Sequence, residues 1–247
     1  MNTAEYERMY SLEDSYWWFV GRHRFVESLL ARRRKASAGR PLDILDIGCG
    51  TGAMSECLKR WGRVVSADFS PLALQFSRRR GLQSLVVADA MRLPLRSERF
   101  DVAVAMDVLE HLEDDCVALT ELQRVLKPGG LLIVTVPAYR HLWSEHDIAL
   151  MHCRRYVRRE LRERLVAAGF KIDKLAHTMT LLYPVVAIQR RLNARKPPKD
   201  KPEASLPPVS AAVNSTLIGL LAIENSVASR IDLPFGLTIA AVATRPA

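Results

Sequence analysis

Short apolar runs alternate with amphipathic stretches from residue 42 onward, and turn residues such as Gly62 and Gly81 separate them. Short runs rich in Val, Ile and Leu predict buried strands, while the longer amphipathic stretches predict helices. Strands that alternate with helices are typical of an α/β fold with a mostly parallel sheet. The predicted strands are 42–47, 63–68, 84–88, 100–106, 131–136, 170–178 and 237–244.

Helices are predicted between and after these strands, at 54–61, 71–80, 116–126 and 158–168. Together the elements predict a Rossmann-like, seven-stranded sheet that is mostly parallel, with helices on both faces. We expect the last strand, 237–244, to run antiparallel to the others.

Two segments lie outside the alternation. The first is rich in aromatic residues and continues into a helical pattern at 22–34, which suggests a cap. The second contains apolar helices at 183–193 and 213–229, joined by a Pro- and Lys-rich stretch, 196–208, that predicts an exposed linker. The predicted organisation is an N-terminal helical cap (1–40), a core (41–180), a helical insertion (181–235) and the last core strand (236–247). The insertion suits a lid, a homodimer contact or peripheral membrane contact, preferred in that order.

Composition narrows the class of protein. The 247 residues are 49% hydrophobic and 26% charged, which excludes collagen, coiled coils and wholesale disorder. The four cysteines contain no CxxC pair, so we predict reduced thiols, a cytoplasmic protein and no metal site. The N-terminus lacks the pattern of a signal peptide. Because the longest apolar stretches, 179–188 and 216–223, fall short of the ~20 residues that span a bilayer, no integral membrane segment is expected.

A formal net charge of +9 fits an anionic partner. The charge is distributed over runs beside predicted helices, at 32–35, 78–80, 154–164 and 190–201. Runs of this kind are usually solvated helix faces, so no nucleic-acid partner is expected.

The strongest local signal is a strand that ends in Gly48, Gly50 and Gly52 and leads into a helix. Glycines allow a tight turn and close approach to a ligand, and the helix start offers free amides to an anionic group. Asp68, at the end of the next strand, is placed to accept hydrogen bonds from a ribose. Gly48, Gly50 and Ala53 also satisfy GxGxxA, so this motif alone does not separate a nicotinamide cofactor from another adenosine ligand.

Further motifs follow in order over about residues 42–137. They are Leu45–Gly52, Asp68, Asp89–Leu95, Phe100–Val102, Met106–Leu112 and Leu126–Leu131. In this combination the chain resembles the class I S-adenosylmethionine-dependent methyltransferases. The resemblance is strongest to the small-molecule branch, methyltransferase type 11, which includes quinone-biosynthesis enzymes. It implies S-adenosyl-L-methionine as cofactor and S-adenosyl-L-homocysteine as product.

The resemblance also implies positions for the cofactor. The methionine end would lie by Gly48 and Gly50, near the carboxylate of Asp46. Asp68 would hold the ribose, and Asp107 would lie by the transferring methyl group. The full set of cofactor-binding residues that it implies is Asp46, Gly48, Cys49, Gly50, Asp68, Phe69, Asp89, Ala90 and Asp107.

Methyl transfer from a sulfonium is an in-line displacement on an activated donor, so orientation is the main requirement. A base helps where the acceptor must lose a proton. His146, Asp147 and His152 follow the fifth strand, at the carboxyl edge where open α/β sheets bind ligands, and are the preferred catalytic residues. Purely structural histidines remain an alternative.

Acceptor binding is expected at the same edge and under the cap. Trp17 and Trp18 could stack on an aromatic acceptor or simply pack. Residues 154–156 could bind an acidic acceptor bidentately or begin a solvated helix. The predicted acceptor-binding residues are Tyr16, Trp17, Trp18, His111, Tyr139, Trp143, Arg154, Arg155 and Tyr156.

The predicted function is methylation of an oxygen or nitrogen of a small-molecule, biosynthetic acceptor, acidic or aromatic in character. Methylation of RNA or protein is the alternative that the charge favours. No Asn-Pro-Pro-Tyr motif follows the fourth strand, where Asp107–Glu110 stand instead. A cofactor-binding partner subunit without chemistry of its own is the third alternative.

Overall fold

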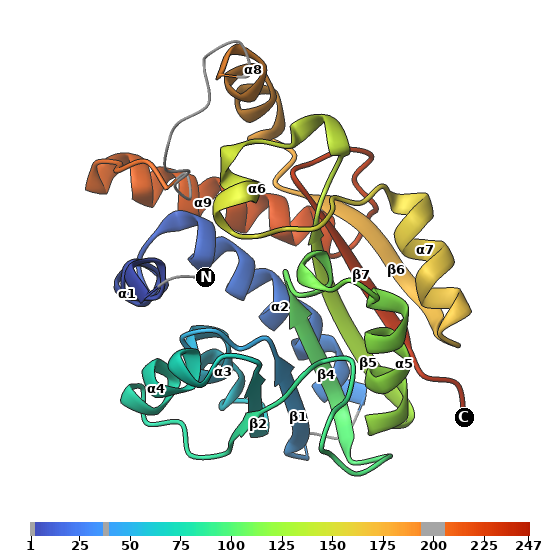
Figure 1. The fold of residues 1–247 in the computed structure, drawn as a ribbon. Coiled ribbons are helices and arrows are strands. Elements are labelled where there is room, and N and C mark those ends of the chain that lie inside the picture. The colour runs from blue at the N-terminus through green and yellow to red at the C-terminus, as the bar shows by residue number, and fades with distance from the viewer. Residues whose placement is uncertain (1–2, 37–39, 194–205) are drawn as a thin grey trace.

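The computed structural model describes residues 3–36, 40–193 and 206–247. Within these ranges the strands form a seven-stranded sheet of order β3-β2-β1-β4-β5-β7-β6, in which β7 runs antiparallel to both of its neighbours. The sheet confirms the predicted fold class (Figure 1). The strands are β1 (Leu42–Ile47), β2 (Gly62–Asp68), β3 (Leu85–Val87), β4 (Phe100–Met106), β5 (Leu126–Pro137), β6 (Lys171–Thr178) and β7 (Thr238–Thr244).

Helices cover both faces of the sheet. The α-helices are α1 (Thr3–Leu12), α2 (Trp17–Ala36), α3 (Ala53–Leu58), α4 (Pro71–Arg79), α5 (Asp115–Val125), α6 (Glu145–Ala149), α7 (Arg158–Ala167), α8 (Tyr183–Asn193) and α9 (Ala211–Ala228). Two short 3₁₀ turns, η1 (Leu109–His111) and η2 (Arg140–Leu142), follow the ends of β4 and β5.

The apolar core lies on both sides of the sheet because every residue of β1, and nearly every residue of β4, is buried. On one side, Leu119 of α5 and Leu161 of α7 belong to the same cluster as Leu45 of β1. On the other, Val26 of α2 and Leu58 of α3 pack with Ile44 of β1. Helix α2 is therefore packed directly on the sheet.

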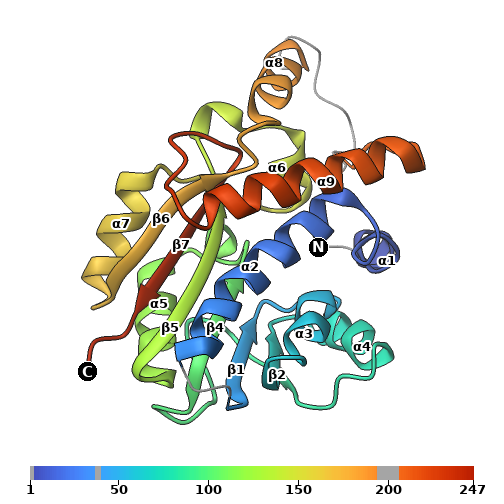
Figure 2. The ribbon, with the colours of Figure 1, turned by 180° about the vertical axis from the view of Figure 1, so that it is seen from behind.

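Helix α9 lies along α2 when the molecule is seen from behind (Figure 2). The buried residues Leu221 and Ala228 face inward, and the amide of Asn225 donates to the carbonyl of Gly21 at 2.7 Å. By length and composition α9 could cross a membrane. No such segment was expected from the sequence, because the uninterrupted apolar stretch within this helix, 216–223, is short. In this structure α9 packs against α2 and is joined to it by the hydrogen bond between Asn225 and Gly21.

The backbone conformation of the turn after β1 requires glycine. Gly48 has a φ of 66°, and a Cβ there would overlap the side chain of Val108. Gly52 has a φ of 91° and precedes the first turn of α3. Both conformations favour glycine, so the chain can turn sharply from β1 into α3 at the carboxyl edge of the sheet.

Candidate active site

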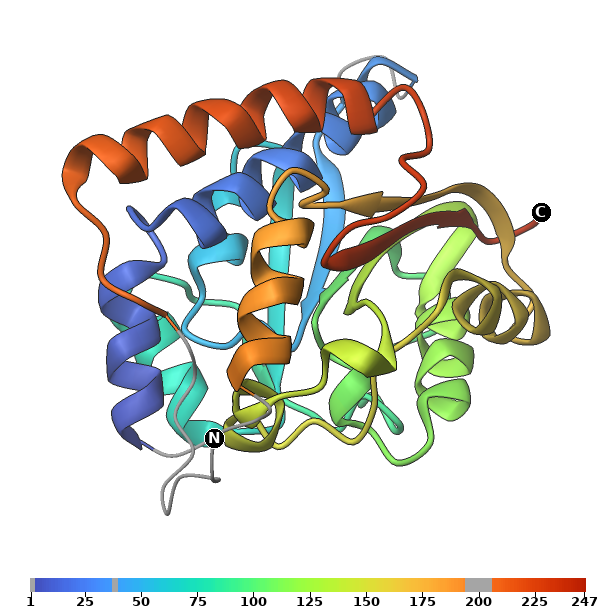
Figure 3. The same cartoon turned by 90° about the horizontal axis from the view of Figure 1, so that it is seen from above.

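A cavity of about 1550 Å³ opens at the carboxyl ends of β1, β2 and β4. Residues of the two N-terminal helices, of the loop around α6 and of α8 line it. Figure 3 shows the arrangement of these elements from above. Pockets for one small ligand are typically ~300–1,000 Å³, so this volume has room for two. The predicted site residues that line it are Tyr16, Trp17, Trp18, Gly48, Cys49, Gly50, Asp68, Phe69, Asp89, Ala90, Asp107, His111, Trp143, His146, His152 and Arg155.

The turn after β1 is tied to the end of β2 by Asp68. One carboxylate oxygen accepts from the amide of Gly50 at 2.9 Å, and the other accepts from the amide of Ser70 at 2.8 Å. Burial raises the pKa of Asp68, and these two bonds oppose the shift. The carboxylate is thus fixed in place while each oxygen keeps a second lone pair.

Asp46 and Cys49 lie deeper. Asp46 is buried under the turn and accepts from the hydroxyl of Ser55 at 2.5 Å; it is not among the residues lining the cavity. Burial raises the pKa of Asp46 to about 7. Burial also raises the pKa of the Cys49 thiol, which makes it a poor nucleophile.

The far end of the cavity is formed by the residues after β2 and β3. The ring of Phe69 is 76% exposed there. Asp89 accepts from the amide of Met91 at 2.8 Å, which closes a turn that holds Ala90 buried. An exposed ring beside a backbone turn gives this end one flat apolar wall and one polar edge.

Arg22 is a site residue that the sequence did not single out. It forms an ion pair with Asp107 and donates to the hydroxyl of Thr135 at 3.1 Å, and that hydroxyl donates to Asp107 at 3.1 Å. The guanidinium carbon lies 5.8 Å from the ring centre of Trp18, one helical turn earlier. The buried Nε of Arg22 has no hydrogen-bond partner among the described residues.

The turn between α1 and α2 is anchored to the glycine-rich loop. Glu13 accepts from the hydroxyl of Thr51, and Arg80 donates to the carbonyl of Thr51 at 2.9 Å. Arg80 also bonds the carboxylate of Asp14 at 2.8 Å. Arg80 was expected on a solvated face, but its side chain is only 8% exposed because it joins three segments. Burial raises the pKa of Glu13 to about 7.

The loop after β5 is organised by Asp147. This buried carboxylate accepts from Nδ1 of His152 at 2.9 Å and from Nε of Arg155 at 2.7 Å, and it lies 3.7 Å from Arg190 of α8. Burial alone would raise the pKa of Asp147, but these partners hold it well below its usual range. Asp147 therefore orients His152, one of the two histidines proposed from the sequence.

The rings of His146 and His111 both lie near that of His152. The ring of His152 is 4.8 Å from that of His111 and 6.3 Å from that of His146. Burial and, to a smaller extent, the positive charge of Arg190 lower the pKa of His146 to about 4. The three imidazoles line the cavity from the segments after β4 and β5, whereas Phe69 lines it after β2, which lies on the other side of β1 in the sheet.

Residues 154–156 do not form the compact binding group that the sequence suggested. Arg154 donates to the carbonyl of Glu113 at 2.7 Å, and Arg155 is buried against Asp147. Tyr156 is fully buried, with its hydroxyl on Asp115. Successive side chains of an extended segment point to opposite sides, so three neighbours reach three different partners.

Tyr139 is also turned away from the cavity lining. Its ring stacks on His141 at 5.1 Å and on His177 at 5.2 Å, between the loop and β6. In contrast, Glu110 of η1 lines the cavity although the sequence gave it no role. Its carboxylate is fully buried beside Asp107, and both effects raise its pKa.

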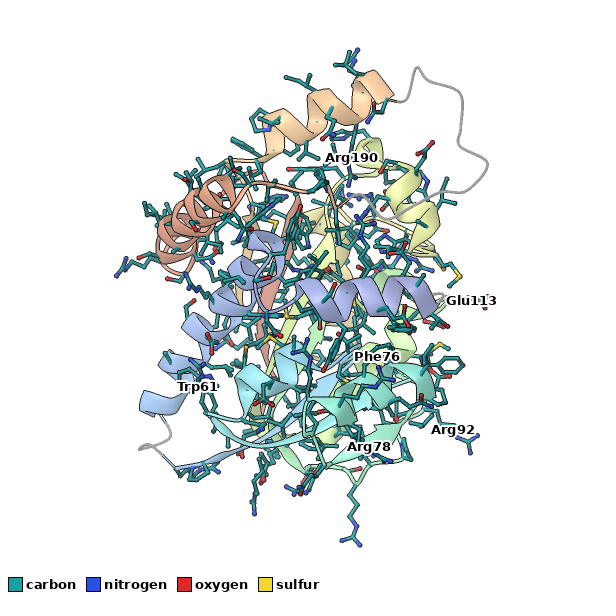
Figure 4. The ribbon with its side chains drawn as sticks, turned by 90° about the vertical axis from the view of Figure 1, so that its left-hand side faces the viewer. Trp61, Phe76, Arg78, Arg92, Glu113 and Arg190 are labelled. Atoms are coloured by element: carbon teal, nitrogen blue, oxygen red, sulfur yellow. The ribbon has the colours of Figure 1, made fainter. Side chains whose placement is uncertain are left out.

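The insertion faces the cavity through α8. Arg190 reaches from α8 toward the α6 loop and donates to the carbonyl of Leu142, whereas Arg92 extends away from the molecule (Figure 4). Most of the predicted linker, 196–208, lies outside the described residues. Its end is described, and there the hydroxyl of Tyr16 donates to the carbonyl of Pro207 at 3.0 Å.

Comparison with known proteins agrees with this geometry. Residues 45–134 match a family model described as "Methyltransferase domain". The matched span is therefore a methyltransferase domain of the class I, S-adenosylmethionine-dependent type. The matched span runs from β1 to β5 and so contains the glycine-rich turn, Asp68 and Asp107.

Two curated relatives of the chain are bacterial. It is 42% identical over 98 residues to a ubiquinone biosynthesis O-methyltransferase of Cereibacter sphaeroides, which covers 37% of this chain and 40% of that protein. It is 33% identical over 165 residues to a probable S-adenosylmethionine-dependent methyltransferase of Mycolicibacterium smegmatis, which covers 65% of this chain and 62% of that protein. The chain thus spans less than two thirds of the length of either relative.

A solved structure shows the same fold over almost the whole chain. It is a Thermotoga maritima protein described as an S-adenosylmethionine-dependent methyltransferase and possible histamine N-methyltransferase. The TM-score is 0.62 at 21% identity, and the match covers 98% of this chain and 95% of that one. At this identity the likeness supports the fold alone.

Proposed function

We propose that the chain transfers a methyl group from S-adenosylmethionine to an oxygen or nitrogen of a small-molecule acceptor. One observation carries the proposal. Gly48, Gly50, Asp68 and Asp107 of the methyltransferase motifs line one cavity of about 1550 Å³. The same cavity is lined by three histidines, His111, His146 and His152. A donor and an acceptor can therefore meet in it without either leaving the protein.

The methionine end of the donor is assigned to the turn after β1. Gly48 and Gly50 allow close approach there, and the carboxylate of Asp46 lies beneath them. Arg22 borders the same region with a buried Nε that has no partner among the described residues. A buried N–H without a partner is unfavourable, so a ligand carboxylate would satisfy it.

The adenosine end is assigned to the residues after β2 and β3. Asp68 keeps a free lone pair on each oxygen, which suits the two hydroxyls of a ribose. Phe69 offers its exposed ring as a wall for the adenine. Asp89 and the amide of Ala90 are placed to pair with the edge of the base.

These assignments direct the sulfonium and its methyl toward Asp107, between the donor turn and the histidines. The acceptor atom attacks the methyl carbon, the carbon–sulfur bond breaks, and the electron pair stays on the sulfur of S-adenosylhomocysteine. An acceptor that carries a proton releases it on the same side. Holding the reactants in line can supply ~7–11 kcal/mol, so positioning is the main contribution of the protein.

The acceptor is assigned to the side of the cavity lined by His111, His146 and His152. Trp18 and Trp143 also line the cavity and suit an aromatic group. Arg155 is already bonded to Asp147, which weakens the case for an acidic acceptor. The name of the Cereibacter relative, an O-methyltransferase, supports oxygen over nitrogen.

The insertion is assigned the role of a lid. Arg190 ties α8 to the α6 loop, and Leu206–Pro208 border the cavity above Tyr16. Closing such a lid would exclude water from the reaction. The division into cap, core, insertion and last strand, a homodimer contact and a cytoplasmic location stay predictions.

The distribution of charge favours a small acceptor over RNA. Arg80, Arg155 and Arg164, which belong to the basic runs, are bonded to carboxylates within the fold. Fewer cations are then free to contact a phosphate backbone, the main source of nucleic-acid affinity.

The proposed function is tested by incubating the protein with S-adenosylmethionine and a panel of phenols, carboxylic acids and amines. Mass spectrometry would detect S-adenosylhomocysteine and a product heavier by one methylene. Turnover with a phenol is the expected result. Methyl incorporation into RNA alone, or no binding of S-adenosylmethionine, would contradict the proposal.

A further inference from the structure

Glu110 of η1 is fully buried, and neither oxygen of its carboxylate has a hydrogen-bond partner among the described residues. Methyl transfer by itself does not require this arrangement. Leaving a buried polar group without partners is costly, and such a group often marks the place of an ion or water. The nearby carboxylates differ, because Asp107 pairs with Arg22 and Asp147 with Arg155.

Two imidazoles lie close to this carboxylate. One ligand atom each of Glu110, His111 and His152 lies within 4.8 Å of the other two. Bonds of about 2.0–2.2 Å to a zinc ion place its ligand atoms roughly 3.0–3.6 Å apart. Small side-chain rotations would therefore bring the three atoms onto one ion.

We propose that Glu110, His111 and His152 bind a divalent transition-metal ion of the zinc type on the acceptor side of the cavity. Two histidines and one carboxylate form a ligand set of catalytic zinc sites, which leave a further position open. The mixture of nitrogen and oxygen ligands favours zinc-type ions over magnesium, which prefers oxygen.

The surroundings of the cluster support this assignment. Asp147 accepts from Nδ1 of His152, which leaves Nε2 for the ion, and a carboxylate behind a histidine ligand is a recurrent arrangement in metal sites. The backbone also holds the ligands together, since the amide of Cys153 donates to the carbonyl of Glu110 at 2.7 Å. That bond joins η1 to the loop that carries His152.

A second group of similar composition makes a useful contrast. Asp114, Asp115 and Cys116 also bring three ligand atoms together. Asp115, however, already accepts from Tyr156 and pairs with Arg164, while Asp114 caps the first turn of α5. Its acidic groups are committed to the fold, so this group needs no ion.

The role of the ion rests on the proposed function, although its binding does not. The open position would take the acceptor oxygen, and a bound cation lowers the pKa of an attached hydroxyl. The proton would leave to solvent, and the resulting oxygen anion would attack the methyl group. The cysteine spacing predicted no metal site, but it holds no information on these ligands, which come from two segments far apart in the chain.

The site is tested by titrating the chelator-treated, full-length protein with Zn²⁺ and, separately, with Co²⁺. We expect one Zn²⁺ per chain, and a visible Co²⁺ spectrum that reports low coordination number. Glu110→Gln and His152→Ala should each weaken Zn²⁺ binding 100-fold or more. His141→Ala and Cys116→Ser serve as controls and should bind as the unmodified protein does.

Zn²⁺ binding that is absent, or that survives both ligand substitutions, would overturn the site. Loss of binding in Cys116→Ser would assign it to the other cluster. Circular dichroism checks the folding of each variant, and Glu110→Gln keeps the shape of the side chain. Binding of S-adenosylmethionine is measured separately. Zn²⁺ binding without binding of S-adenosylmethionine would contradict the proposed function but not the metal site.

Discussion

Arg22 of α2 holds Asp107 at the end of β4 through an ion pair, and thereby joins the N-terminal helices to the centre of the cavity. The backbone of Asp107 has a φ of 53°, a conformation that is strained for a residue other than glycine. The ion pair and the hydroxyl of Thr135 fix the carboxylate at that point. The N-terminal segment thus completes the site.

Replacing this arginine should weaken binding of the donor. We expect Arg22→Met to lower the affinity for S-adenosylmethionine by roughly tenfold or more, since a charged hydrogen bond contributes ~1.5–3 kcal/mol. Arg24→Met, on the exposed side of the same helix, is the matched control. Calorimetry that finds equal affinities for the two variants would remove Arg22 from the donor site.

The two loop histidines should differ in their effect on turnover. Asp147 fixes His152 at 2.9 Å, so His152→Ala should lower kcat by ~10²-fold through loss of acceptor positioning. His146→Ala should have a smaller effect. Neither change should alter the affinity for S-adenosylmethionine, because both side chains lie on the acceptor side. Equal losses of kcat in the two variants would argue against the role given to Asp147.

Glu13 should make stability depend on pH. Burial raises the pKa of Glu13 from 4.5 to about 7, so between these values the folded chain binds a proton that the unfolded chain lacks. The contribution of Glu13 to the free energy of unfolding therefore falls as pH rises through this range, by on the order of 3 kcal/mol. Above it, the buried charge is a constant penalty.

Glu13→Gln removes this titration. Urea unfolding across the same pH range should show the variant gaining stability relative to the unmodified protein as pH rises. Glu5→Gln, in the first turn of α1, is the control. A difference in stability that does not change with pH would show that Glu13 is charged throughout.

The sequence predicted the strands well because buried parallel strands are short and apolar, and glycines or prolines interrupt them. Asp68 and Asp107 were placed correctly at strand ends for the same reason. Arg22, Arg80 and Glu110 were missed because their roles arise from contacts between segments far apart in the chain, which no local pattern records. Residues 154–156 show the opposite error, since neighbours in sequence diverge in space.

The helix boundaries show how tertiary contacts extend a local pattern. The first long helix was predicted at 22–34, whereas α2 begins at Trp17. The amide of Trp17 donates to the side chain of Asn214 at 2.9 Å, so α9 caps a helix start that the sequence alone did not reveal.

The most direct test of the account is calorimetric titration of S-adenosylmethionine into the unmodified protein, Asp68→Ala, Asp68→Asn and His152→Ala. We predict one binding site per chain and a loss of roughly 2 kcal/mol in Asp68→Ala. Asp68→Asn should also bind less tightly, because an amide NH₂ would face either the Gly50 or the Ser70 backbone N–H. His152→Ala should bind as the unmodified protein does. No binding, or binding that Asp68→Ala leaves unchanged, would contradict the placement of the donor at the glycine-rich end of the cavity.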